Sequence, residues 1–241
     1  MRQIKWLVIC LLGWSSLAFG NDESLITKVK EQVSGLWALG ASHQVSNYKG
    51  VDSQLGLTPL VFGRLGPVFI EANRASYSIY RDGTWFGSLV GHIRNHQYKE
   101  ADELSGEKKR ALELGGQIGR RLGDGVATRL ALVNDVSGAH QSYELDWQLY
   151  KRQFFGDLAL LTAIGVQHQS AGLVDYYYGT DTFKGEAGQV IEREAIATYY
   201  WNDWAAFAGV RYYQFGDNVN DSPLVEGKYT SNLFSGIGFS L

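Results

Sequence analysis

Hydrophobic and polar side chains alternate along most of this sequence, from Gly35 to the last residue, with a period of two residues. The clearest segment is 142–151, where four apolar residues alternate with four polar ones. These are Tyr143, Leu145, Trp147 and Leu149 against Ser142, Glu144, Asp146 and Gln148. Because successive side chains of a strand point to opposite faces, this segment has one dry face and one polar face. Repeated segments of about 10 to 14 residues with this pattern are typical of transmembrane barrels.

Four further segments show the same split, at 111–121, 126–133, 158–167 and 204–212. In the last of these, Trp204 and Tyr212 bracket the apolar face. Eight residues at ~3.3 Å each span ~26 Å, close to the height of the outward apolar band of a barrel. We therefore expect two aromatic girdle positions on this strand.

Turn chemistry falls between the segments. Asp82-Gly83 and Asp124-Gly125 suit tight hairpins. The pattern also breaks at 64–67 and at 202–203. Longer polar stretches, which we interpret as loops, lie at 97–110, 169–187 and 217–227. In a barrel of this class the long loops face outward and the short turns face the periplasm.

The number of strands raises a parity problem. The alternation gives eleven segments, whereas a barrel with both ends in the periplasm needs an even number. Dividing 66–82 into two short strands near Arg74 gives twelve, and a strand hidden within 171–183 is the other option. The predicted fold is all-β: a transmembrane antiparallel up-and-down barrel of twelve strands, within a range of ten to twelve.

The end of the chain also favours a membrane barrel. A soluble β-sandwich alternates as well, but its strands are shorter than these segments. At the C-terminus, alternating apolar positions continue to the final residue: Tyr229, Leu233, Ile237, Phe239 and Leu241. This resembles the terminal signal that the barrel-assembly machinery recognises, with Leu where an aromatic residue is commonest.

The start of the chain resembles a secretory signal peptide. Arg2 and Lys5 precede an apolar run over 6–17, and Ala18-Phe19-Gly20 offers small residues for cleavage before Asn21. The run is shorter than the ~20 residues of a membrane-spanning helix, although an uncleaved anchor is the competing interpretation. We expect a signal peptide over 1–20, a periplasmic extension over 21–34 and an outer-membrane barrel over 35–241.

Composition narrows the function further. Cys10 is the one cysteine and lies in the predicted signal, which excludes disulfides, Cys-based zinc sites and a Cys nucleophile from the mature chain. Without the signal, the net charge moves from −3 to −5, because two of the 22 basic residues and none of the 25 acidic ones are lost. This balance gives no reason to expect nucleic-acid binding.

Charged residues on the polar faces predict the nature of the lumen. The set consists of Glu113, Arg129, Glu144, Asp146 and Arg211. In a barrel of about twelve strands they either pair across the lumen and seal it or line a small pore. Their mixed signs favour the sealed, salt-bridged interior.

Catalytic and metal-binding patterns are weak. No G-x-S-x-G, P-loop or H-E-x-x-H motif occurs. On a strand, His92 and His96 would be about 13 Å apart, too far to share one metal. Three histidines near predicted strand ends have serines close in sequence, as a rim hydrolase would require: His43 with Ser42, His140 with Ser142, and His168 with Ser170. Sequence proximity does not define a triad, so we expect no catalytic residue, no cofactor and no metal.

Four motifs, in order along the chain, resemble those of the MipA/OmpV family (MltA-interacting proteins) of outer-membrane proteins. They are Tyr48-Lys49-Gly50-Val51-Asp52, Thr58-Pro59-Leu60, Tyr176-Tyr177-Tyr178-Gly179 and Asp221-Ser222-Pro223-Leu224-Val225. The family has Ser where Val51 stands, which suggests a divergent member. The motif positions carried over are Tyr48, Gly50, Asp52, Pro59, Tyr176, Tyr178, Gly179, Asp221, Ser222 and Pro223.

The motifs also have local physical interpretations. Pro59 would suit a bulge or a strand end, and 221–223 favours a defined turn. The three tyrosines at 176–178 are interpreted as an interfacial girdle in preference to a loop contact site.

The resemblance implies a non-catalytic scaffold in outer-membrane lipid that joins a murein transglycosylase to a murein synthase. It leaves a porin-like channel and a surface adhesin or antigen as alternatives.

Overall fold

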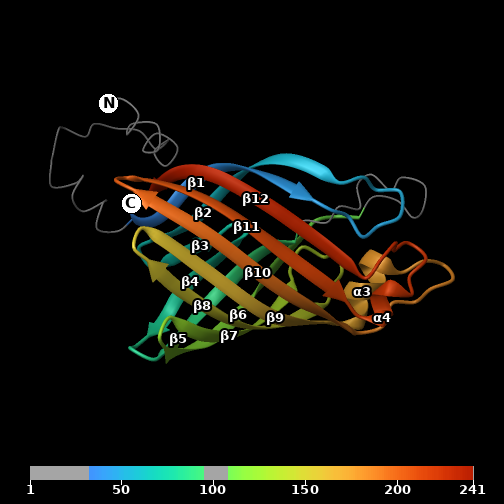
Figure 1. Cartoon of the computed structure of the whole chain (residues 1–241). Coiled ribbons are helices and arrows are strands. Elements are labelled where there is room, and N and C mark those ends of the chain that lie inside the picture. The colour runs from blue at the N-terminus through green and yellow to red at the C-terminus, as the bar shows by residue number, and fades with distance from the viewer. Residues whose placement is uncertain (1–32, 95–107, 241) are drawn as a thin grey trace, which may run out of the picture. The chain divides into compact units, whose positions relative to one another are not determined.

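The computed structural model describes residues 33–94 and 108–240, which form one closed antiparallel barrel (Figure 1). Each strand pairs with the next along the chain, and β12 closes the barrel on β1 from Leu36↔Ser240 to Gln44↔Asn232. The strands are β1 Val33–Gln44, β2 Gln54–Leu65, β3 Val68–Glu71, β4 Arg74–Arg81, β5 Trp85–Arg94, β6 Ala111–Gly123, β7 Val126–Asp135, β8 Tyr143–Phe155, β9 Leu158–Gln169, β10 Gly188–Trp201, β11 Trp204–Phe215 and β12 Tyr229–Ser240. The predicted twelve-stranded up-and-down barrel is confirmed.

The two ends of the barrel differ in the length of their connections. At one end, called here the turn end, strands are joined at 66–67, 82–84, 124–125, 156–157 and 202–203. At the other, the loop end, the connections include 45–53, 136–142, 170–187 and 216–228. Helices α3 (Ala171–Tyr178) and α4 (Asp217–Asn220) lie at the loop end (Figure 1). In the part of the chain that the structure describes, no helix is long and apolar enough to cross a membrane.

Segment 66–82 contains two short strands, as the parity argument predicted. β3 and β4 form a hairpin that turns at Ala72 and Asn73, and β4 begins at Arg74. The alternative, a strand within 171–183, is wrong because α3 occupies this region. The predicted signal peptide, most of the 21–34 extension and most of the 97–110 loop lie outside the described residues.

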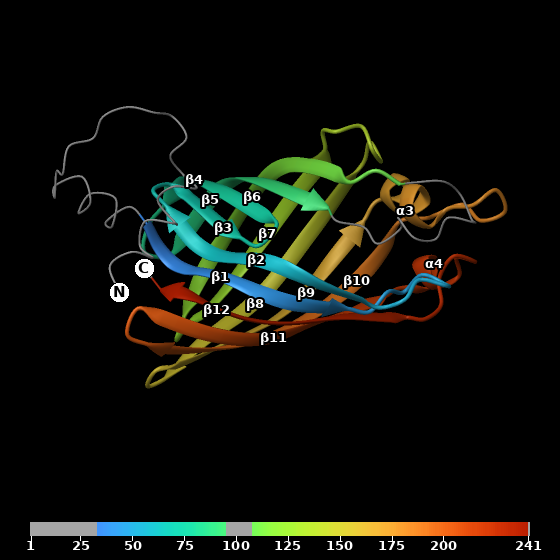
Figure 2. The same ribbon diagram turned by 90° about the horizontal axis from the view of Figure 1, so that it is seen from above.

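Pro59 lies inside β2, and our expectation of a bulge or a strand end was wrong. The β1–β2 ladder runs through Leu39↔Pro59 without a register shift. The short strand β3 pairs only with 62–65 of β2. Among the described residues, 54–60 therefore pair with β1 alone (Figure 2). This stretch is in effect an edge strand, which is where proline is tolerated.

The alternation of the sequence separates an apolar outside from a polar inside. On β8, Tyr143 and Trp147 are exposed, whereas Glu144 and Asp146 between them are buried. Other exposed apolar side chains around the wall include Leu39, Leu89, Leu114, Ile118, Leu130, Leu132, Ile164, Leu233 and Ile237. A monomeric soluble protein rarely exposes so continuous an apolar surface. An outward band of this kind is what a membrane barrel presents to lipid.

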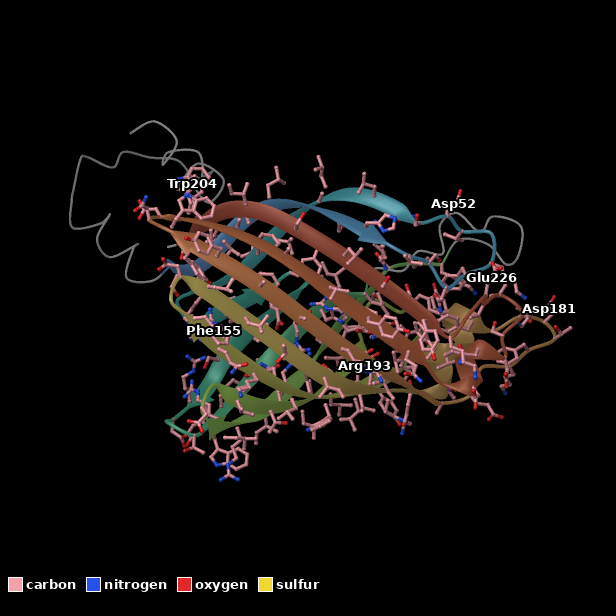
Figure 3. The ribbon with its side chains drawn as sticks, viewed as in Figure 1. Asp52, Phe155, Asp181, Arg193, Trp204 and Glu226 are labelled. Carbon is pink, nitrogen blue, oxygen red and sulfur yellow. The ribbon has the colours of Figure 1, made fainter. Side chains whose placement is uncertain are left out.

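Aromatic pairs occur toward both ends of the wall. Trp204, labelled in Figure 3, packs near the turn end against Phe239 with the rings tilted and their centroids 4.1 Å apart. Toward the loop end, Tyr212 stacks on Tyr229 at 5.4 Å. The two girdle positions predicted on this strand therefore both lie in aromatic pairs, which suit the boundaries of an apolar layer.

Two turn-end glycines provide a matched test of the hairpin geometry. Gly125 has φ +75°, and a Cβ there would lie 2.0 Å from the carbonyl oxygen of Arg152. Gly66 has φ +57° with open space around it. Left-handed backbone costs a non-glycine residue about 1–2 kcal/mol. We expect Gly66→Ala to lower the free energy of unfolding by about that amount and Gly125→Ala to lower it by clearly more, measured by urea titration in lipid vesicles. Equal losses would contradict this geometry.

Candidate functional site

Three of the four sequence motifs come together at the loop end in a buried cluster, called here the cap cluster. Its members come from the β1–β2 loop, α3, α4 and the loop before β12. They are Tyr48, Leu173, Val174, Tyr177, Tyr178, Val219, Leu224 and Val225. Tyr48 and Val225 are more than 170 residues apart in the sequence, yet both belong to this apolar core. Their backbones also pair in an isolated β-bridge.

Specific bonds hold the cap cluster together. The Tyr48 hydroxyl donates to the Tyr177 carbonyl at 3.2 Å, and the rings of Tyr48 and Tyr178 stack at 5.4 Å. The Ser222 hydroxyl donates to the Tyr178 carbonyl at 2.6 Å and accepts from the backbone N–H of Leu224 at 3.2 Å. The helix α3 is thereby fastened to two other loops at the loop end of the barrel.

The interpretation of 176–178 as an interfacial girdle was wrong. Tyr177 and Tyr178 are buried in the cap cluster. Tyr176 packs against Tyr177 at 4.9 Å, and its hydroxyl accepts the backbone N–H of Lys109 at 2.8 Å. The tyrosines lie on a loop-end helix, so their rings face the cap and not the lipid boundary.

The other motif residues have simpler roles. Gly50 has φ +72°, a left-handed turn that glycine adopts without strain. Gly179 follows the last residue of α3. A Cβ at this position would lie only 2.3 Å from the Asp175 carbonyl oxygen, so the position leaves no room for a side chain. Asp52, Asp221 and Pro223 are exposed.

Burial raises the pKa of the Tyr177 and Tyr178 hydroxyls. In an unfolded segment tyrosine ionises near pH 10, so the stability of the cap is fully present below about pH 10 and falls as the pH rises further. In an absorbance titration of tyrosinate, we expect the double variant Tyr177→Phe with Tyr178→Phe to lose two phenols that ionise above pH 10. If the two phenols missing from the variant are instead ones that ionise near pH 10 in the unmodified chain, Tyr177 and Tyr178 are not buried as described.

Below the cap cluster, Glu113 is the centre of a buried ionic group. Its side chain is 1% exposed. It accepts from His92 Nδ1 at 2.9 Å, from His140 Nε2 at 2.9 Å and from Arg94 Nε at 2.8 Å. Arg94 also bridges to Glu144 at 2.8 Å. The His140 ring lies 5.9 Å from the Tyr177 ring, so this group adjoins the cap.

Three more ion-paired groups line the middle of the lumen. Arg74 pairs with Asp146 at 3.3 Å, and Arg129 pairs with Glu71 at 2.9 Å. Arg211 pairs with Glu192 at 3.1 Å and also with Glu194. All five charges that the sequence placed inside, Glu113, Arg129, Glu144, Asp146 and Arg211, therefore lie in the lumen and are ion-paired.

Sequence reasoning identified none of the ion-pair partners of these five charges. They are Glu71, Arg74, His92, Arg94, His140, Glu192 and Glu194. The period-two pattern of 188–201 would have placed Glu192 and Glu194 on one face. No local pattern identifies Glu71, because it ends a strand of only four residues.

The turn-end half of the lumen contains an apolar cluster, called here the apolar plug. It consists of Leu36, Leu60, Ile196, Ala205, Phe207 and Phe234. Between the plug and the cap, the ion pairs and several amide side chains line a cavity of about 250 Å³. Cap, ion pairs and plug thus occupy successive levels of one lumen.

The serine and histidine pairs considered for catalysis do not come together as a triad requires. Ser142 and Ser170 form a hydrogen bond with each other, and His140 donates to Glu113. His168 packs near Tyr143 at 6.5 Å. In residues 33–94 and 108–240, no group of three or more His, Cys, Asp or Glu side chains could hold a metal ion. His96 lies outside these ranges.

Comparison with known proteins identifies the family. The family model described as MltA-interacting protein MipA matches residues 37–241. The chain belongs to the MipA family. Its MipA-family relatives include curated proteins named MltA-interacting protein from Escherichia coli (strain K12) and Shigella flexneri. Each is 30% identical over 123 residues, which is 46% of this chain and 49% of the relative. The match thus spans about half the length of these relatives.

A solved structure of the NanC porin, in a rhombohedral crystal form, is similar to this MipA-family chain with a TM-score of 0.46 and 11% identity. The similarity covers 85% of this chain and 100% of the porin chain.

Proposed function

We propose that this protein is a non-catalytic outer-membrane barrel that holds a murein transglycosylase, together with a murein synthase, at the outer membrane. The observation that carries the proposal is the family match over 37–241, combined with relatives whose name is MltA-interacting protein. The name states an interaction of those relatives, and we extend it to this chain.

The filled lumen supports a platform in preference to a channel. A porin keeps a water-filled path through its lumen. Here the path from the loop end meets the cap cluster, then the Glu113 group, then the apolar plug. A barrel filled in this way can anchor a partner without conducting solutes, and the function then depends on its surfaces.

The turn end is the proposed side of contact with murein enzymes. In barrels of this class short turns face the periplasm and long loops face outward. Under this orientation α3, α4 and the exposed Asp52, Asp181 and Glu226 (Figure 3) face the exterior. The turn end then faces the compartment where murein is made.

Affinity capture from envelope extracts tests this function. The full chain, tagged at a loop-end position such as 226–228, should recover a murein transglycosylase identified by mass spectrometry. A barrel of similar size from another family, tagged in the same way, serves as the control. If the chain recovers no more murein enzyme than the control, the scaffold proposal is wrong.

A further inference from the structure

Four arginines form an arc at the turn end of the barrel, called here the arginine arc. They are Arg64 on β2, Arg81 on β4, Arg121 on β6 and Arg152 on β8. Each lies within three residues of the end of a strand that runs toward the turn end. Consecutive members are two strands apart, or about 10 Å at the usual spacing of strands, so the arc is about 29 Å long as measured along the curved wall.

The strand register places the arginine arc on the lumen side of the wall. Arg121 pairs with Ala127, which is buried inside the barrel. Arg152 pairs with Leu161, which packs against the apolar plug. Arg64 follows by two residues Phe62, which also packs against the plug. Arg81 pairs with Phe86, Phe86 with Gly119, and Gly119 with Arg129, whose ion pair lies in the lumen. Side chains that are paired directly across strands share a face, so these guanidinium groups face the mouth and not the lipid.

None of the four arginines of the arc forms an ion pair within the described residues. The arginines there that form ion pairs are Arg74, Arg94, Arg129 and Arg211, all deeper in the lumen. Within the arc, Arg64 and Arg121 lie close enough to Arg81 for their charges to act on it. Like charges at such range repel, and an anion between them would remove the repulsion.

The carboxylate of Asp82, in the turn between β4 and β5, is already engaged. Asp82 accepts backbone N–H bonds from Thr84 and Trp85, both at 2.6 Å, and a bond from the Tyr80 hydroxyl. The same turn fixes Arg121, whose Nη1 donates to the carbonyl oxygens of Asp82 and Gly83 at 3.1 and 3.2 Å. The protein backbone therefore holds Arg121 at the mouth through Nη1, and its other guanidinium N–H groups remain able to donate to a ligand.

We propose that the arginine arc binds an acidic peptide segment of a protein partner, laid across the turn-end mouth of the barrel. A single phosphate ion is too small to contact four arginines over about 29 Å. An extended peptide covers that distance with about nine residues at ~3.3 Å each. Guanidinium groups pair with carboxylates in a bidentate manner, which suits Asp and Glu side chains. The proposal rests on the proposed function for one point, that the turn end faces the periplasm.

The test uses the full chain, purified in zwitterionic detergent, and a fluorescent oligoglutamate peptide of about nine residues. Fluorescence anisotropy should show saturable binding that weakens as salt screens the charges. One exposed ion pair contributes up to about fivefold to binding affinity. The double variant Arg81→Gln with Arg121→Gln removes two such pairs and should bind the peptide roughly tenfold more weakly.

Arg120→Gln is the matched control, because Arg120 is the neighbour of Arg121 in sequence but faces outward over the Trp85 ring at 5.3 Å. It should leave binding unchanged. Heat-modifiable gel migration shows that each variant is a folded barrel.

Three results would overturn the proposal: no saturable binding, equal losses in the control and the double variant, or full displacement of the peptide by inorganic phosphate at a similar concentration. The last result would indicate a site for one small ion. If the chain captures a murein transglycosylase but binds no peptide, the peptide-binding proposal is wrong and the scaffold function stands. If it binds the peptide but captures no murein enzyme, the scaffold function is wrong and peptide binding by the arginine arc stands.

Discussion

Glu113→Ala is expected to lower the free energy of unfolding by about 3–5 kcal/mol, the usual cost of removing one partner from a buried ion pair. Glu113 is 1% exposed and accepts from His92, His140 and Arg94. Its loss leaves two imidazoles without an acceptor and Arg94 with Glu144 as its remaining carboxylate. These groups lie in the lumen, where water cannot fully replace a carboxylate.

Urea unfolding in phospholipid vesicles, followed by tryptophan fluorescence, measures this change. Glu226→Ala is the control, because Glu226 is exposed on the loop before β12. The control should change stability by less than about 0.5 kcal/mol. If both variants lose the same small amount, the Glu113 group does not stabilise the lumen.

Arg211→Met is expected to have an effect of similar size, through a different mechanism. Arg211 is the cation that pairs with both Glu192 and Glu194, which lie two residues apart on the inner face of β10. Without it, two buried carboxylates repel each other and lose the cation that pairs with both, which again costs about 3–5 kcal/mol.

Neutralising the carboxylates should reverse this loss. The triple variant Arg211→Met with Glu192→Gln and Glu194→Gln carries no net charge at this site, and we expect it to recover most of the lost stability in the same unfolding measurement. Replacing a buried ion pair with neutral groups of similar size is often nearly neutral. A triple variant as unstable as Arg211→Met would show that packing of the arginine, and not its charge, stabilises β10 and β11.

The fold was predictable because a barrel wall imposes a strict local rule. Every residue of a segment such as 142–151 faces either lipid or lumen, so the pattern of Tyr143 and Glu144 already encodes the side on which each lies. Closure imposes the second rule. The even strand number favoured a division of 66–82 over a strand within 171–183, and the structure has β3 and β4 at 66–82.

The candidate site was less predictable, because its contacts join residues that are far apart in sequence. The cap cluster depends on Tyr48, Tyr178 and Ser222 meeting at one end of the barrel, and no period within 45–53 or 217–227 indicates this. Helix α3 is short, has no side-chain hydrogen bond at its N-terminus and lies in a stretch with no helical period to detect. Packing against the other loops stabilises it, so its local sequence alone did not predict it.

Ion pairing inside the lumen was predictable in kind but not in its pairs. The sequence gives the sign and the face of Glu144 or Arg211, and mixed signs already indicated pairing. Which partners meet depends on register and on strand order around the barrel. Arg94 reaches Glu144 from β5, three strands away from β8.

Single-channel recording in planar lipid bilayers tests most directly whether this barrel is a closed platform. The full chain is purified, reconstituted and compared with a general porin at equal protein concentration. The cap cluster, the buried ion pairs and the apolar plug predict a bilayer that stays at baseline, with no steady unitary conductance. Steady, reproducible channels of uniform size from the folded full chain would contradict the closed lumen and favour a porin-like function.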